Sequence, residues 1–224
     1  MYAEHAPTSD LADRVACFWR QVGEDDGAQL VVPDGCVDLI WGPEGPFVAG
    51  PDTGPVATKM TIGDTFTGLR FKPGAVGDLF GVPLSDLRDR RVPVADLTVF
   101  RVPEAPPAGH LRALRSAVGT RIRETPPPDT AAPAIVAALV AGHSVAGVAA
   151  DLGLSERQLH RRSVAGFGYA PKTLQRVVRF QHALRLARAG TPFAEVAITA
   201  GYADQAHLSH DVKRLSGATL SRLL

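Results

Sequence analysis

The side chains best suited to reading DNA occur twice in the C-terminal third of the chain. The first set follows Gly153 and comprises Arg157, Gln158, His160 and Arg161. The second follows Gly201 and comprises Gln205, His207, His210, Lys213 and Arg214. Arg and Lys bind guanine edges or phosphates, and Gln binds adenine. This chemistry predicts contact with double-stranded DNA.

The two sets belong to an internal repeat. Val148-Ala149 and Gly153 recur 48 residues later as Val196-Ala197 and Gly201, and Leu159 corresponds to Leu208 with one extra residue in the second copy. Each copy has the order of a helix-turn-helix unit: a small buried pair, a Gly that can adopt positive φ, and an apolar anchor for a second helix. The repeat therefore predicts two reading units in one chain.

Helix signals surround both units. Ser144, Ser155 and Asp204 are suited to cap helices, and Pro171 is suited to begin one that continues to Ala189 without a breaker. A helix of that length spans about 28 Å. Adjacent major-groove faces of B-DNA recur every ~34 Å, so we expect this helix to hold the two units in neighbouring grooves.

The same residues resemble the DNA-binding domain of the AraC/XylS-type transcription regulators over about 132–224. The likeness rests on the Val-Ala-x-x-Leu-Gly-Leu-Ser-x-x-x-Leu-x-Arg run at 148–161, the Gly168-x-x-Pro171 step, and the run Gly201-Tyr202-x-Asp204-x-x-His207-Leu208-Ser209. It implies seven helices with two helix-turn-helix motifs. By position, it places base-facing side chains at Arg157, His160 and Arg161 and at Gln205, Ala206 and His210. The full set expected at DNA is Ser155, Arg157, Gln158, His160, Arg161, Lys172, Gln205, Ala206, His207, His210, Lys213 and Arg214.

The chain departs from that family at four positions. Ser163 and Val212 stand where a core Phe is usual, His210 where Arg is usual, and Leu220 where Pro is usual. A neutral His reaches less far than Arg. We therefore expect the first unit to read bases more strongly, and the second to contribute more to positioning on the backbone.

The first part of the chain has the pattern of β-strands. Short β-branched or aromatic runs bounded by Gly, Pro or Asp occur at 15–22, 29–42, 47–50, 59–64 and 66–71, and helical spacing follows at 74–82 and 84–89. PDGCVDLIWG and GLRFKPGAVGDLFGV, within about 11–97, resemble the N-terminal domain of a subset of AraC-like regulators of unknown function. The resemblance implies a small sensor or dimerisation domain.

Candidate effector-binding residues in this part follow from chemistry. Trp19, Trp41 and Phe71 could supply flat apolar walls, and Asp38 and Arg70 orienting charges. The alternative is that the aromatic side chains belong to the core, as most aromatics in strands do.

Charge and composition divide the chain into unlike parts. Residues 1–105 hold 9 Lys and Arg against 16 Asp and Glu, a net charge of −7, whereas residues 106–224 hold 15 against 7, or +8. We therefore predict an α+β protein: a β-rich sensor or dimerisation domain at 1–105, a helical, Pro-rich linker at 106–129, and an all-α DNA-binding domain at 130–224. The helix expected at 111–124 is interpreted as a core or dimer contact.

Other functions remain to be separated from sequence-specific regulation. An enzymatic or repair-type N-terminal domain would need a reactive Cys17 or Cys36 or a metal, and a nucleoid-structuring protein would bind DNA without sequence preference. No catalytic motif or metal-ligand cluster is evident, so we expect no enzyme activity, cofactor or metal. The partners expected are DNA, RNA polymerase, a small-molecule effector and a second copy in a homodimer. Without an apolar run long enough for a membrane, a cytoplasmic location is expected.

Overall fold

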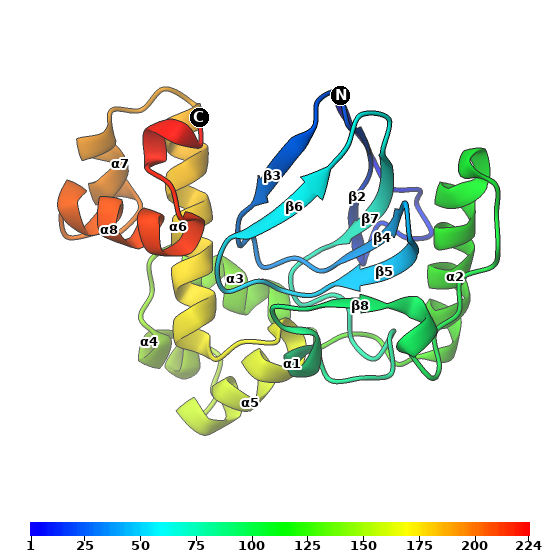
Figure 1. Cartoon of the computed structure of the whole chain (residues 1–224). Helices are drawn as coiled ribbons and strands as arrows, with labels where there is room; N and C mark the ends of the chain where they lie inside the picture. Colours follow the sequence, from blue (N-terminus) through cyan, green and yellow to red (C-terminus); the bar gives the residue numbers. More distant parts are fainter.

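The computed structural model describes all residues from Met1 to Leu224. Its N-terminal part is built on one antiparallel sheet with the strand order β1-β2-β7-β4-β5-β8. The strands are β1 (Tyr2–His5), β2 (Val15–Val22), β4 (Asp38–Gly42), β5 (Gly45–Ala49), β7 (Thr65–Phe71) and β8 (Arg91–Pro93). The remaining strands, β3 (Gly27–Val31) and β6 (Val56–Met60), form a separate two-stranded ribbon. Figure 1 shows this ribbon between the sheet and the C-terminal helices.

The sheet buries its two faces against different partners. One face carries the largest core cluster, in which Leu39, Leu69 and Phe71 pack with Leu114 and Val118 of α2 (His110–Glu124). The helix expected at 111–124 therefore packs in the core of the N-terminal part. Of the two interpretations of that helix, a core contact or a dimer contact, the structure shows the core contact. The opposite face carries a smaller cluster around Trp19, Ile40 and Ala49 and looks toward the ribbon.

The C-terminal part is helical, as expected. It contains α3 (Ala132–Val140), α4 (Val145–Asp151), α5 (Glu156–Phe167), α6 (Pro171–Arg188), α7 (Phe193–Thr199), α8 (Gln205–Ser216) and a final 3-10 turn, Leu220–Arg222. One core lies under α4 and α5 and another under α7 and α8. Helix α6 contributes to both, with Leu174 in the first and Phe180 in the second. Figure 1 shows α6 as the long helix that joins the two units.

Strand and helix predictions differ from the structure in several places. The run predicted at 29–42 divides into β3 and β4, which belong to different sheets, because Pro33 and the positive φ of Gly35 interrupt it, and the run predicted at 59–64 lies mostly beyond β6. Strands β1 and β8 were not predicted, because each is short and lies at an edge of the sheet. Residues 74–82 form turns and no helix; Gly74, Gly77 and Gly81 all have positive φ there. Helical spacing alone could not reveal this break. The following helix, α1 (Leu84–Leu87), is shorter than the predicted 84–89.

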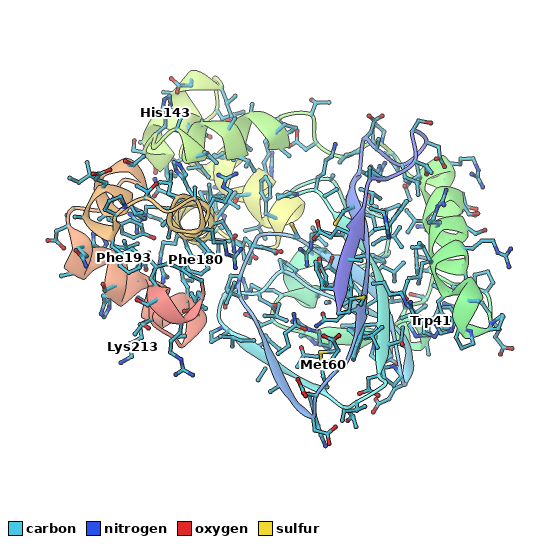
Figure 2. All side chains as sticks on the ribbon, turned by 90° about the horizontal axis from the view of Figure 1, so that it is seen from above. Trp41, Met60, His143, Phe180, Phe193 and Lys213 are labelled. Carbon is cyan, nitrogen blue, oxygen red and sulfur yellow. The ribbon has the colours of Figure 1, made fainter.

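The two parts of the chain touch through side chains as well as through the connecting segment. The Gln181 amide on α6 donates to the backbone oxygen of Pro33 at 2.6 Å, and an Arg88 guanidinium nitrogen donates to the backbone oxygen of Gly168 at 3.4 Å. In Figure 2, α6 is seen almost end-on beside the sheet domain, with Phe180 at its side and Trp41 at the far side of the sheet, next to α2.

Candidate DNA-reading surface and inter-domain pocket

The first helix-turn-helix unit consists of α4 and α5. The Ser144 hydroxyl caps α4 by accepting from the Gly147 N–H at 3.0 Å, and Val148 and Ala149 are buried against the neighbouring helices. Gly153 has φ of 65°, as the turn requires, and Leu159 anchors α5 in the core. These features confirm the predicted construction of the unit.

The outer face of α5 presents the predicted base-reading residues to solvent. Arg157, His160 and Arg161 are all exposed, and none has an ion-pair or hydrogen-bond partner within the chain. The neighbouring Arg162 differs, because it is held by Asp129 at 2.8 Å. Three unpartnered polar side chains on one helix face can reach an incoming DNA groove.

Ser155 and Gln158 have a structural role in the same unit. The Ser155 hydroxyl accepts from the Gln158 N–H at 3.3 Å, while the Gln158 side-chain oxygen accepts from the Ser155 N–H at 2.8 Å. This capping box satisfies two N–H groups at the start of α5. The predicted DNA contacts of these two residues therefore compete with helix capping.

The second unit repeats the construction with α7 and α8. Val196 and Ala197 are buried, Gly201 has φ of 79°, and Leu208 anchors α8. The Asp204 carboxylate caps α8 by accepting from the His207 N–H at 2.7 Å. The residues predicted to face DNA are all exposed: Gln205, Ala206, His207, His210, Lys213 and Arg214. In Figure 2, Lys213 points outward from α8, away from the sheet domain.

His207 differs from its neighbours, because its imidazole also takes part in local packing. The ring lies edge-on against Tyr202, with centroids 5.2 Å apart, and its Nδ1 accepts from the Ala203 N–H at 3.4 Å. The same residue thus fixes the turn before α8 while remaining exposed.

A buried carboxylate joins α8 to the long helix. Asp211 is only 6% exposed, and its two oxygens accept from Arg176 at 3.2 Å and from Arg179 at 3.0 Å. The Arg179 guanidinium also lies over the Tyr202 ring, 4.2 Å from its centroid. The orientation of the second reading helix is therefore set by charge-assisted bonds to α6 as well as by apolar packing.

The departures from the usual family residues are accommodated in the cores. Ser163 is fully buried, and its hydroxyl donates to the backbone oxygen of Tyr169 at 2.8 Å, so it leaves no unsatisfied polar group. Val212 and Leu220 are buried in the core of the second unit. The residues that replace the usual Phe and Pro are therefore buried beneath the two helices α5 and α8.

Helix α6 sets the spacing between the two units. Its 18 residues span about 27 Å, close to the length that the sequence predicts. Lys172 is exposed in its first turn, next to the end of α5. This placement suits a phosphate contact beside the first unit.

A pocket of about 330 Å³ lies between the N-terminal domain and α6. One wall is the face of the sheet that carries Trp19, Ile40 and Ala49, a second wall is the β3–β6 ribbon, and a third is α6. The α6 residues are Gln181, Leu184 and Arg188, which lie at helical spacing on one face. Because the walls of this cavity come from both domains, its shape depends on how the two domains are placed relative to each other.

Three arginines and three carboxylates line this pocket, and two of the arginines, Arg70 and Arg91, are paired with carboxylates. The Arg70 guanidinium donates to the Asp38 carboxylate from two nitrogens, each at 3.1 Å, and lies 3.6 Å from Asp34. Arg91 makes a two-point contact with Asp52, at 2.7 and 2.8 Å. Burial raises the pKa of Asp38 even though Arg70 opposes the shift.

The structure brings some of the candidate effector-binding residues together at this pocket and places others elsewhere. Trp19, Asp38 and Arg70 line the pocket. Trp41 does not; its ring stacks on His110 of α2, with centroids 4.0 Å apart. Phe71 is likewise buried in the core on the α2 side. Both point away because alternate residues of a strand face opposite sides of the sheet.

Other lining residues were not predicted at all. Asp52 lies in a loop and Arg91 in the short edge strand β8, so neither has a local pattern that marks it. Gln181, Leu184 and Arg188 belong to a helix that the sequence assigns to the DNA-binding part. The helical spacing of these three could have indicated a shared face, although not what that face contacts.

The two cysteines do not have the environment of nucleophiles. Burial, followed by nearby carboxylates, raises the pKa of the Cys36 thiol well above its usual value and that of Cys17 to about 11. A reactive cysteine needs the opposite shift, toward the thiolate. No group of three or more His, Cys, Asp or Glu side chains is placed to hold a metal, and no helix is long and apolar enough to cross a membrane.

Comparisons with known proteins agree with this division of the chain. Residues 3–93 match the model of a domain of unknown function (DUF6597), and residues 148–224 match that of a helix-turn-helix domain. No curated protein matches the chain.

Several solved structures are similar at low identity. An apo variant of ToxT from Vibrio cholerae is 10% identical over 92% of this chain and 96% of that chain, with a TM-score of 0.49. ToxT from Vibrio cholerae with a bound unsaturated fatty acid is 13% identical over 92% of this chain and 94% of that chain, with a TM-score of 0.44. The xylose-binding transcription activator XylR is 16% identical over 57% of this chain and 41% of that chain, with a TM-score of 0.36. At these values, none of them indicates what this chain binds.

Two helix-turn-helix units that share one connecting helix, with polar faces free on both second helices, define a DNA-binding protein. The chain thus carries a helix-turn-helix domain at residues 148–224, whose sequence resembles the AraC type, and a DUF6597 domain at residues 3–93.

Proposed function

We propose that the protein is a sequence-specific transcription regulator that reads two adjacent major-groove sites with α5 and α8. The observation that carries this is the exposed, unpartnered set Arg157, His160 and Arg161 on α5. A second exposed face, on α8, lies in the unit at the other end of α6. The wider set of DNA contacts in the proposal is Ser155, Gln158, Lys172, Gln205, Ala206, His207, His210, Lys213 and Arg214.

Selection of bound sequences from random DNA by the full chain tests this function. We expect one site with two blocks of preferred bases about one helical turn apart. Affinity for that site should fall steeply as salt increases, because phosphate contacts release counterions. Binding without any preferred sequence would favour a nucleoid-structuring role instead. Competition with random DNA separates the two outcomes.

We also propose that a small molecule bound in the inter-domain pocket modulates DNA binding. Support comes from the walls of the cavity, which combine the sheet, the ribbon and α6. Because α6 belongs to the cores of both reading units, a ligand that contacts Gln181, Leu184 and Arg188 acts on the helix that sets their spacing. A ligand shifts DNA affinity only as far as it prefers one domain arrangement over another.

Filling the cavity by substitution tests this modulation without knowledge of the ligand. Leu184→Trp places a larger side chain at the α6 wall, whereas Leu186→Trp changes the same helix outside the pocket lining. We expect the first variant to alter operator affinity more than the second, provided that circular dichroism shows both to be folded. Equal affinity in the two folded variants would contradict control from the pocket.

A further inference from the structure

The charged side chains of the inter-domain pocket are equal in number, three carboxylates and three arginines, but are unevenly placed. Asp34 and Asp38 share a single guanidinium, that of Arg70, while Asp52 has Arg91 to itself. The N-terminal domain thus contributes three carboxylates and two arginines to the lining, and α6 contributes the third arginine. The remaining charged residue, Arg188, is exposed, and its guanidinium donates to the backbone oxygen of Leu223 at 3.4 Å.

Of the two carboxylates that share Arg70, Asp34 makes the longer contact. Its side chain is 32% exposed, against 14% for Asp38, and its nearest Arg70 contact is 3.6 Å against 3.1 Å. One Asp34 oxygen accepts from the Cys36 N–H at 2.8 Å, which holds the carboxylate in place at the pocket wall. Asp34 therefore offers a fixed, accessible acceptor, whereas Asp38 is already satisfied by Arg70 and by the Trp19 indole N–H at 3.3 Å.

Aromatic and apolar side chains form much of the remaining lining. Trp19, Phe47 and Phe66 belong to one cluster on the face of the sheet opposite α2, and Met60 lines the pocket from the ribbon. The Trp19 indole lies directly against Gly68, where a Cβ atom would come within 2.4 Å of the ring. Such rings bind the flat body of a ligand, and their faces attract positive charge.

We infer that this pocket binds a small organic cation, in which an ammonium group pairs with Asp34 beside the Arg70–Asp38 pair and an aromatic body lies among Trp19, Phe47 and Phe66. The inference rests on the proposed ligand control of DNA binding. An anion of the same shape is disfavoured beside Asp34, because the two arginines at that wall are already paired with carboxylates and only Arg188, on α6, has no carboxylate partner. The volume of about 330 Å³ is at the small end of ligand sites and suits a one- or two-ring amine.

Three indole probes of nearly identical shape test the charge preference. They are tryptamine, which is a cation; indole-3-propionate, which is an anion; and tryptophol, which is neutral. Calorimetry with the full chain should give the tightest binding for tryptamine, followed by tryptophol and then indole-3-propionate. Asp34→Asn keeps the acceptor for the Cys36 N–H and removes only the charge. It should weaken tryptamine binding about tenfold while leaving tryptophol binding nearly unchanged.

The control variant is Asp25→Asn, which removes an exposed carboxylate outside the pocket and should leave tryptamine binding unchanged. Tryptamine binding that is no tighter than indole-3-propionate binding, or that survives Asp34→Asn intact, overturns the assignment of a cation. Tryptamine binding that depends on Asp34 but does not change operator affinity supports the cation site and contradicts the proposed ligand control. The two proposals can thus fail separately.

Discussion

The phenol of Tyr169 donates a hydrogen bond to the backbone oxygen of Asp52, 2.9 Å away, across the junction of the two domains. Tyr169 is fully buried and lies two residues after α5 ends at Phe167, and its own backbone oxygen accepts from the Ser163 hydroxyl within that helix. Asp52 in turn holds Arg91 at the pocket wall. One buried side chain thus connects the pocket wall to the end of the first reading helix.

Replacing this phenol should weaken the junction. Tyr169→Phe removes the only hydrogen bond made by the Tyr169 hydroxyl and leaves the Asp52 oxygen without that donor, so we expect a loss of about 1 kcal/mol in the free energy of unfolding. Chemical denaturation measures it. Tyr2→Phe is the matched control, because Tyr2 is 48% exposed and its loss should stay within about 0.5 kcal/mol. If the two variants lose the same free energy of unfolding, the hydrogen bond between Tyr169 and Asp52 does not stabilise the junction.

The Tyr169–Asp52 contact shows where sequence reasoning ends. Both helix-turn-helix units were predicted from local features, namely the caps Ser144, Ser155 and Asp204 and the two turn glycines, because caps and turns act over a few residues. The junction instead joins residues 117 positions apart. No periodicity or turn pattern indicates such a pairing, so neither the pocket wall at Asp52 nor the role of α6 in it was predicted.

Strand register explains why Trp41 does not line the pocket with Trp19. Trp19 and Ile40 both pair with Gly68, from β2 and β4 on either side of β7, so these three residues lie in one row across the sheet. Trp41 follows Ile40 and must therefore face the other side, where it meets His110. The alternation within each strand was readable from the sequence. The register between the strands, which decides whether Trp19 and Trp41 share a face, was not.

Gly68 should be intolerant of any side chain. In Gly68→Ala, the new Cβ would lie 2.4 Å from the Trp19 indole, so the ring must move away from the sheet. We expect a loss of about 1–3 kcal/mol in stability and a shift of Trp19 fluorescence. The measurement uses a Trp41→Phe background, so that Trp19 alone reports. Gly27→Ala is the control, because nothing lies within 4 Å of the Cβ position there. An unchanged spectrum in Gly68→Ala would contradict this placement of the indole.

Asp211 should control the second reading helix without touching DNA. Asp211→Asn removes the charge that holds Arg176 and Arg179 against α8, and we expect a stability loss of about 1–3 kcal/mol, since both arginines retain some exposure to solvent. Selection of bound sequences should then show reduced base preference in one half-site only. Glu195→Gln, an exposed acid on α7, is the control. Preference lost equally from both half-sites would argue against a local role for Asp211.

The two units should differ in how much sequence they read. Arg161 is exposed and has no partner in the chain, so Arg161→Ala should cost about 1–3 kcal/mol in operator affinity and relax preference at one base position. Arg123→Ala, on α2 of the N-terminal domain, is the matched loss of an arginine and should leave base preference unchanged.

His210 occupies the comparable face of α8 with a shorter side chain that lacks the guanidinium donors, so His210→Ala should change base preference less than Arg161→Ala. The reverse substitution sharpens the comparison. His210→Arg should add preference in the second half-site, because the longer guanidinium reaches a guanine edge with two donors. Bound-sequence selection with the three variants measures each effect. If the unmodified chain shows equal base preference in both half-sites, the expected difference between the two units is wrong. If His210→Arg leaves the base preference of the second half-site unchanged, His210 is not the cause of that difference.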